Sequence, residues 1–266
     1  MTTHLVQFST GAASAEVAWR VVAEHGKDDV VLLTADTLVE DDDNWRFAGE
    51  VAERLGCEWV RLTDGRTPMQ VGRDQKCVPN NRMAVCSRIL KRELLDEYRA
   101  AHYDPATTVV YVGYDWTEMH RVEAARRHWL PWIVDFPLTR PPYLWKEQVL
   151  DLFRERGIEP PRLYAQGFPH ANCGGACVRG GQAQWELLLR VNRPRYLEWE
   201  AEEEKTRAEL GKDVSILRDR AAKPGRTAET RALSLRQFRE RLDTQPSLFD
   251  CGDWGACGCN MTGGAA

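Results

Sequence analysis

A run of small and hydroxylated residues joins the first apolar segment of the chain to its first helical pattern. The run reads Phe8-Ser9-Thr10-Gly11-Ala12-Ala13-Ser14 and follows Leu5-Val6. Such residues let a backbone approach a phosphate closely, and the first N–H groups of the following helix carry partial positive charge without an intrahelical acceptor. The run has no lysine and no Gly-Lys-Ser/Thr ending, so it is not a Walker loop. We call residues 8–14 the first loop, and its composition predicts a strand–loop–helix unit that binds a phosphate group.

The first half of the chain alternates continuous apolar segments with amphipathic ones. The apolar segments predict strands over residues 5–8, 30–33, 59–62 and 109–112. The amphipathic segments predict helices that end near Gly26 and at Gly56, and further helices over residues 87–101 and 146–156. Strands that read as continuous apolar runs are typical of a parallel sheet buried on both faces. We therefore expect a Rossmann-like α/β fold with helices on both faces of the sheet.

After about residue 160 the character of the sequence changes. Residues 168–182 are rich in glycine and cysteine, and residues 184–210 predict a long helix interrupted near Pro194. The acidic stretch 200–204 is interpreted as a solvated helix face, and Ser234 with Gln237 has the spacing of a capping box. These features divide the chain into an α/β domain, residues 1–160, and a helical, cysteine-rich C-terminal region, residues 161–266.

The composition is that of an ordinary globular protein, with 43% apolar and 29% charged residues among 266. The net charge of -4 argues against nonspecific binding of nucleic acid by the whole protein. No apolar run reaches the length of a membrane span, and the N-terminus lacks the pattern of a secretory signal. We therefore expect a cytoplasmic protein that does not bind membranes. Because disulfides are rare in that compartment, the eight cysteines call for metal or sulfur chemistry.

Polar residues cluster after the predicted strands, where ligands of open parallel sheets bind. Arg82, Lys91 and Arg121 are candidates to neutralise phosphate, and carboxylates after the strands would hold Mg²⁺ or orient those cations. The candidate nucleotide-binding residues outside the first loop are Asp36, Arg82, Gly113, Asp115 and Glu118.

The cysteines fall into groups of different meaning. Cys173 with Cys177, and Cys257 with Cys259, form two closely spaced pairs in glycine-rich segments. Together they supply the four thiolates of a [4Fe–4S] cluster or of a tetrahedral zinc ion. Cys86 precedes a helix beside basic residues, which favours its thiolate, and it is either a fifth candidate ligand or a nucleophile that carries sulfur. His170, Cys77 and Cys251 remain open as further ligands.

A basic segment lies over residues 218–241, with eight arginine or lysine residues against three acidic ones. A patch of this kind can contact nucleic-acid phosphates, or it can be a solvated helix and loop.

Taken together, these motifs resemble the PAPS-reductase-like branch of the PP-loop adenine nucleotide α-hydrolase superfamily, which includes many phage and bacterial proteins. The resemblance rests on the first loop, Asp36, the segment Cys86-Ser87-Arg88-Ile89-Leu90-Lys91, residues 113–121, residues 170–177 and Cys257-Gly258-Cys259. Proteins of DNA phosphorothioation in this superfamily have a similar Cys-x-x-x-Leu-Lys motif and a downstream cysteine cluster that holds iron–sulfur. The chain departs from the family at Thr10, where a glycine is usual, and lacks the C-terminal Glu-Cys-Gly-Leu-His motif of the sulfonucleotide reductases.

The resemblance implies binding of ATP, or of PAPS or APS, with Mg²⁺, and chemistry at the α-phosphate. We expect an enzyme that adenylates a substrate for transfer of sulfur or another nucleophile, with Cys86, Lys91 and Arg121 as catalytic residues. The expected partners are a nucleic-acid acceptor (tRNA or DNA), a sulfur-donor protein and a second copy of the chain. Two alternatives stay open: a sulfonucleotide reductase, and a non-catalytic adenine-nucleotide-binding protein with structural zinc.

Overall fold

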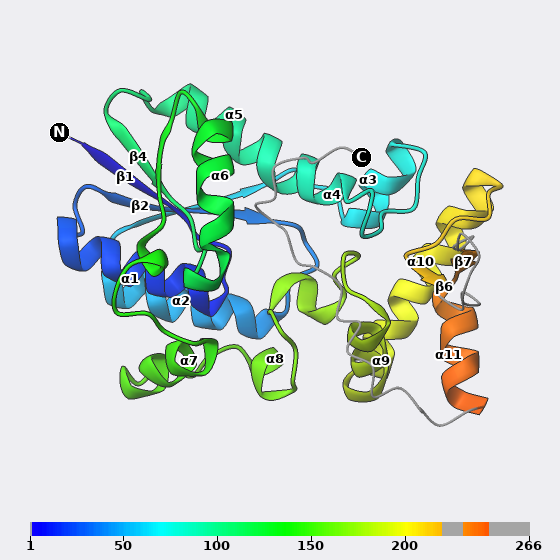
Figure 1. Ribbon diagram of the computed structural model, residues 1–266. Helices are drawn as coiled ribbons and strands as arrows, with labels where there is room; N and C mark the ends of the chain where they lie inside the picture. The colour runs from blue at the N-terminus through cyan, green and yellow to red at the C-terminus, as the bar shows by residue number, and fades with distance from the viewer. Residues whose placement is uncertain (1, 220–230, 245–266) are drawn as a thin grey trace.

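A computed structural model describes residues 2–219 and 231–244 and contains a parallel five-stranded sheet (Figure 1). The strand order is β3-β2-β1-β4-β5, and the central strand β1 pairs with β2 and β4. The strands are β1 (Thr3–Gln7), β2 (Val30–Asp36), β3 (Glu58–Thr63), β4 (Thr108–Tyr111) and β5 (Ile133–Asp135). Because every pairing is parallel, all five carboxyl ends lie at one edge of the sheet, and the Rossmann-like α/β prediction is confirmed.

Helices cover both faces of the sheet, and each face has its own apolar core. The first face carries α1 (Ala12–His25), α2 (Asp42–Leu55) and α7 (Lys146–Glu155), and the second carries α5 (Leu94–His102) and α6 (Val122–Trp129). Neighbouring strand residues point to opposite faces, so Val6 packs in the first core while Leu5 packs in the second. This two-sided burial explains why the strand sequences are continuously apolar.

Local signals place the ends of the first helices as the sequence predicts. The side chain of Asp41 accepts a hydrogen bond from the Asp43 N–H at 2.9 Å and caps α2. The same helix ends at Gly56, which has the left-handed conformation. The predicted helix over 87–101 is also present, as α4 (Val85–Ser87), a π-helical segment Arg88–Glu93 and α5 in succession.

Several short elements complete the described part of the chain. The helices among them are α3 (Pro68–Asp74) and α8 (Arg162–Ala165), with 3-10 turns at Trp116–Arg121, Pro137–Thr139 and Asn172–Gly175. Residues 168–182 otherwise lack a long regular element, as their glycine and cysteine content predicts.

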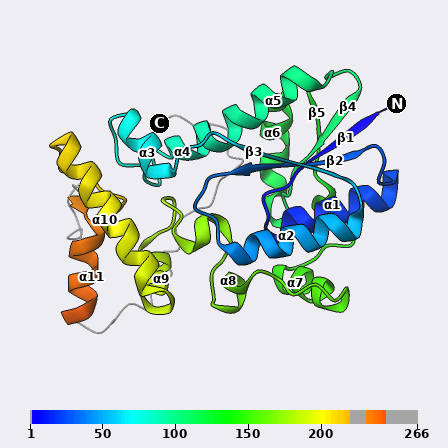
Figure 2. The same ribbon diagram turned by 180° about the vertical axis from the view of Figure 1, so that it is seen from behind.

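The C-terminal helices form a third packed group beside α3 and α4, which both views show (Figures 1 and 2). The elements are α9 (Gln182–Val191), α10 (Arg193–Leu210), the hairpin β6 (Leu217–Asp219) with β7 (Arg231–Leu233), and α11 (Leu235–Thr244). The predicted interruption near Pro194 is the break between α9 and α10 at Asn192. The apolar core of this group holds Trp185 and Tyr196 and also takes Leu90 from before residue 160. The division of the chain at residue 160 stays a prediction.

The interpretation of residues 200–204 as a solvated face is wrong for two of the glutamates. Glu203 is fully buried, and its carboxylate accepts hydrogen bonds from the backbone N–H groups of Ile216 at 2.7 Å and Leu235 at 2.6 Å. Glu200 is 7% exposed and binds the Arg239 guanidinium at 2.8 Å. These carboxylates therefore anchor the hairpin and α11 onto α10.

The described part of the basic segment is largely neutralised within the molecule. Arg239 and Arg236 face Glu200, and Arg241 lies 2.8 Å from Asp219. Residues 220–230 of the segment lie outside the described residues. Within the described part, no helix is long and apolar enough to cross a membrane.

Candidate functional site

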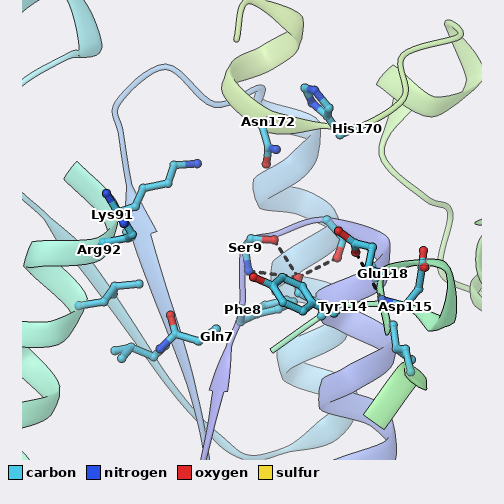
Figure 3. Close-up of a pocket in the computed structure, with 18 of the residues that line it drawn as sticks. Gln7, Phe8, Ser9, Lys91, Arg92, Tyr114, Asp115, Glu118, His170 and Asn172 are labelled. Atoms are coloured by element: carbon cyan, nitrogen blue, oxygen red, sulfur yellow. Dashed lines mark hydrogen bonds between the residues drawn. The ribbon is translucent and has the colours of Figure 1, made fainter. Parts of the chain in front are cut away.

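A cavity of about 530 Å³ opens at the carboxyl edge of the sheet (Figure 3). Its floor is strand residues of β1 and β2, and its walls come from four separate parts of the chain together with Leu138. These are the first loop, the helix that runs from Lys91 through α5, the segment from Gly113 through Trp132, and residues 144–172. The cavity thus lies where the sequence analysis expects a ligand.

The first loop is held by its own serines. Ser14 Oγ accepts a hydrogen bond from the Ser9 N–H at 3.1 Å and donates one to the Gly11 carbonyl at 2.9 Å. Thr10 has a φ of 62°, so the left-handed conformation that usually calls for glycine is adopted here by a β-branched residue. The loop keeps its turn although the glycine usual at position 10 is absent.

The N-terminus of α1 presents backbone donors to the cavity. The N–H groups of Ala13 and Ser14 have no acceptor within the first helical turn, and both residues line the cavity. The Ala12 N–H instead donates to the Tyr164 hydroxyl at 3.2 Å. A Cβ atom on Gly113 would lie 3.5 Å from the Ser14 nitrogen, so the glycine keeps the space above that amide open.

Basic side chains outnumber acidic ones around this cavity. Figure 3 shows Lys91 and Arg92 on one side of it and Asp115 and Glu118 on the other. The cationic lining residues are Lys91, Arg92, Arg99, Arg121 and Lys146, and the acidic ones are Asp96, Asp115 and Glu118. Five cations against three carboxylates favour an anionic ligand.

Arg121 is positioned by two neighbours on the segment after β4. Its guanidinium pairs with Glu118, donates to the Tyr114 hydroxyl at 3.1 Å, and lies 4.2 Å from the centre of the Tyr114 ring. Burial raises the pKa of Glu118, against the opposing effect of Arg121. Asp115 accepts hydrogen bonds from Thr117 and thereby begins the 3-10 turn.

Two of the predicted nucleotide contacts do not line the cavity. The Asp36 carboxylate is bound by Arg61 of β3 at 2.5 Å and by the Leu38 N–H at 2.8 Å. Arg82 is exposed on a loop and is not among the lining residues. Asp36 lies at the carboxyl end of β2 as expected, but Arg61 and Leu38 bind its carboxylate, whereas Arg82 lies on the loop between α3 and α4 and follows no strand directly.

Three cysteines line a second, smaller cavity. Cys86, Cys173 and Cys177 meet there together with Lys91, which lines both cavities. Burial raises the pKa of the Cys86 thiol to about 12, and the neighbouring Cys173 adds to the shift. The prediction that nearby basic residues favour a Cys86 thiolate is therefore wrong, because desolvation outweighs the effect of Lys91.

The donor chemistry of this cluster suits a metal centre, although the described residues do not complete one. Within residues 2–219 and 231–244, no three His, Cys, Asp or Glu side chains are grouped closely enough to hold a metal ion. Thiolates are the ligands that zinc and iron–sulfur clusters take in proteins. The predicted ligands Cys257 and Cys259, and the open candidate Cys251, lie outside the described residues.

The sequence analysis missed a buried carboxylate that contacts Lys91, which lines both cavities, and Cys173, which lines the second. Glu40 follows β2, and its side chain is 4% exposed. One of its oxygens lies 3.4 Å from Lys91 Nζ, and the other accepts a hydrogen bond from the Cys173 N–H at 2.5 Å. Glu40 stands in an acidic stretch, and only the tertiary structure distinguishes it from the acids that follow it, such as the exposed Asp42 and the helix cap Asp41. Tyr164 and Lys146 were missed for the same reason.

The fold and this cavity define a Rossmann-like α/β protein with a cationic cavity at the carboxyl ends of its strands. No protein-family model matches the chain, and neither does any curated protein. Among solved structures, it is similar to a U34-tRNA thiolase from Methanococcus maripaludis with its [4Fe-4S] cluster. That likeness has 12% identity and a TM-score of 0.47, and covers 78% of this chain and 71% of the thiolase.

Two further structures are similar at the same level. A PAPS reductase from Candida auris, in a phosphate complex, has 15% identity and a TM-score of 0.42, covering 62% of this chain and 78% of the reductase. An NH3-dependent NAD synthetase from Campylobacter jejuni has 14% identity and a TM-score of 0.39, covering 79% of this chain and 84% of the synthetase. These neighbours are members of the PP-loop adenine nucleotide α-hydrolase superfamily, which the sequence resembles. At these identities and TM-scores, none of them assigns an activity to this chain.

Proposed function

We propose that the protein binds an adenine nucleotide in the larger cavity and catalyses attack on its α-phosphate. The observation that carries the proposal is the first loop, whose Ala13 and Ser14, at the N-terminus of α1, line a cavity with five cations against three carboxylates. A helix N-terminus joined to an excess of cations is suited to the phosphate groups of a nucleotide.

In the proposed reaction an oxygen of the substrate attacks the α-phosphorus of ATP. A new oxygen–phosphorus bond forms, the bond from the α-phosphorus to the bridging oxygen breaks, and pyrophosphate leaves with the electron pair. The N–H groups of Ala13 and Ser14 hold the leaving pyrophosphate, and Lys91 and Arg121 neutralise the charge that develops. Mg²⁺, when bound, supplies further charge neutralisation and would be held by Asp115 or Glu118. A second nucleophile, such as a sulfur donor, then displaces AMP from the adenylate.

The identity of the acceptor is a separate part of the proposal. A nucleic-acid base, in tRNA or DNA, is the acceptor that the sequence resemblance implies. The described arginines of the basic segment give this acceptor little support, because Arg236, Arg239 and Arg241 face carboxylates of the chain itself.

We also infer that Cys173 and Cys177 hold a thiolate-bound metal centre together with the predicted ligands Cys257 and Cys259, and that Cys86 is a fifth candidate ligand. When bound, an iron–sulfur cluster would supply sulfur-transfer or redox chemistry beside Lys91. The support is the common cavity of the three thiols and the position of Lys91 between that cavity and the larger one.

The test of nucleotide binding uses one exposed position in the first loop. Ala13→Glu places a carboxylate at the proposed phosphate site, whereas Ala124→Glu makes the same change on an exposed position of α6 outside the cavity. Calorimetry with ATP is expected to show binding to the wild type and to Ala124→Glu, and none to Ala13→Glu. Equal binding by both variants would remove the case for the first loop.

Turnover distinguishes the enzyme from a nucleotide-binding protein. Pyrophosphate release from ATP, assayed with tRNA, DNA and small-molecule acceptors, is expected from the wild type and not from Ala13→Glu. Tight ATP binding without release under any of these conditions would favour the non-catalytic alternative.

A further inference from the structure

A buried arginine forms one wall of the larger cavity without using all of its donors. Arg99 lies on α5, and its side chain is only 4% exposed. One terminal nitrogen, Nη2, donates to Asp96 at 2.5 Å. The Nε and Nη1 atoms are buried and have no hydrogen-bond partner in the described structure. Because a buried guanidinium without acceptors is costly, these two donors call for an explanation.

Two indole rings fix the position of this guanidinium. Its central carbon lies 4.6 Å from the ring centre of Trp129 and 4.9 Å from that of Trp132. Both tryptophans also line the cavity. Cation–π contacts of this kind hold a guanidinium in place and supply no hydrogen-bond acceptor. The arginine is therefore preorganised while its two donors stay unused.

Arg99 lies at the end of the cavity away from the first loop. Eight residues separate it from Lys91, which corresponds to about 12 Å along a helix. Helix α5 leads through a short connection into the amino end of β4, so Arg99 lies toward the amino ends of the strands. The first loop lies at their carboxyl ends. A phosphate on the first loop and a group on Arg99 therefore occupy different parts of one cavity.

We propose that Arg99 forms a second anion subsite, which binds a carboxylate, sulfate or phosphate group of a ligand at the end of the cavity beside Trp129 and Trp132. An oxyanion that reaches the guanidinium, with a shift of the side chains that cover Nε and Nη1, accepts the two hydrogen bonds that these atoms have available and adds a charge-assisted contact. The walls around the arginine include Leu95, Trp129 and Trp132, so an anionic group attached to an apolar body fits best. The subsite does not depend on the proposed chemistry at the α-phosphate.

The probe is inorganic sulfate, titrated calorimetrically into the full-length protein carrying Ala13→Glu. That change blocks the first loop, so the remaining sulfate binding reports on Arg99. Two charge-assisted hydrogen bonds predict a dissociation constant on the order of 1 mM. Adding Arg99→Gln is expected to weaken binding about tenfold or more. Adding Arg126→Gln, an exposed arginine of α6 outside the cavity, is expected to leave it unchanged.

A second measurement uses the wild-type side chain directly. The Nε–H resonance of Arg99, assigned by its loss in Arg99→Lys, is expected to shift during the sulfate titration. A purely structural arginine would change the melting temperature when replaced but would leave sulfate affinity unaltered. No sulfate binding, equal affinity with and without Arg99→Gln, or a stationary Nε–H resonance would each overturn the proposal.

The source of the anionic group follows from repeating the titration with the unblocked wild type in the presence of ATP. Unchanged occupancy of the Arg99 subsite assigns it to a separate small substrate. Competition by ATP, or tighter binding of a nucleotide with an additional ribose phosphate, assigns it to the nucleotide. Loss of ATP binding in Ala13→Glu while Arg99 still binds sulfate would separate the two sites, so either proposal can fail alone.

Discussion

Gly113→Ala tests the first loop with the addition of a single methyl group. The added Cβ would lie 3.5 Å from the Ser14 nitrogen, 3.6 Å from the Ser14 Cα and 3.7 Å from the Ala13 carbonyl carbon. These are ordinary van der Waals distances, so the fold has room for the change. These three similar distances place the methyl group above the plane of the peptide that carries the Ser14 N–H, in cavity space that the body of a phosphate group bound to that N–H would share.

The expected cost is steric displacement of the phosphate group and, with it, the loss of one charge-assisted hydrogen bond. Such a bond contributes about 1.5–3 kcal/mol, which corresponds to ATP binding weaker by about 10- to 150-fold. The stability of the fold should change little, because Gly→Ala at a compatible position acts mainly on the unfolded state, by about 0.4–1 kcal/mol.

Calorimetric titration with ATP measures the affinity, and a urea melt confirms that the variant is folded. Gly49→Ala is the matched control, since Gly49 lies within α2 and an added Cβ there would meet no atom within 4 Å. We expect normal ATP affinity in Gly49→Ala and reduced affinity in Gly113→Ala. Wild-type affinity in a folded Gly113→Ala protein would show that the phosphate group does not occupy the space between Gly113 and the Ser14 N–H.

Three further outcomes are expected. In urea melts, Gly174→Ala should destabilise the protein by about 1–3 kcal/mol more than Gly211→Ala. Both residues have a positive φ, but only at Gly174 would an added Cβ collide with an arginine side chain. Equal losses of stability in the two variants would contradict this packing argument. Burial raises the pKa of Glu203 from 4.5 to about 7, so the folded state holds this proton more tightly than the unfolded state. The resulting stabilisation of the folded state, about 3 kcal/mol, is present below pH 4.5 and lost as the pH rises through 7. Glu203→Gln should abolish this pH dependence of the free energy of unfolding. Cys177→Ala should lose iron or zinc in elemental analysis of anaerobically purified protein while Cys57→Ala keeps it, and equal metal content would exclude Cys177 as a ligand.

The alternation of strands and helices through β3 follows from the sequence because each element is long and has clear end signals. Residues such as Gly56 mark helix ends by local conformation alone. Helix α6 and strand β5 were not predicted, since β5 has three residues and the buried side chain of α6 is Ala125. Periodicity cannot identify elements that bury so little.

The same distinction applies to the site, where positions set by local sequence were predicted and contacts between distant segments were not. That the first loop and Gly113 line one cavity follows from their places after parallel strands. Contacts across the chain were beyond prediction, because nothing near Ala12 indicates that a tyrosine 152 residues away will bind its N–H. The ionisation of Cys86 was predicted wrongly because sequence neighbours show the nearby charges and not the degree of burial.

The contact between Tyr164 and the first loop has a consequence for synthesis of the protein. A nascent chain emerges from the ribosome N-terminus first, so the sheet strands and the first loop leave the ribosome before the segment that carries Tyr164 and His170. Until then the cavity lacks one wall and the Ala12 N–H lacks its partner. The pocket is therefore completed late in translation, and a ligand that needs this wall is captured only after the later part of the chain has been made.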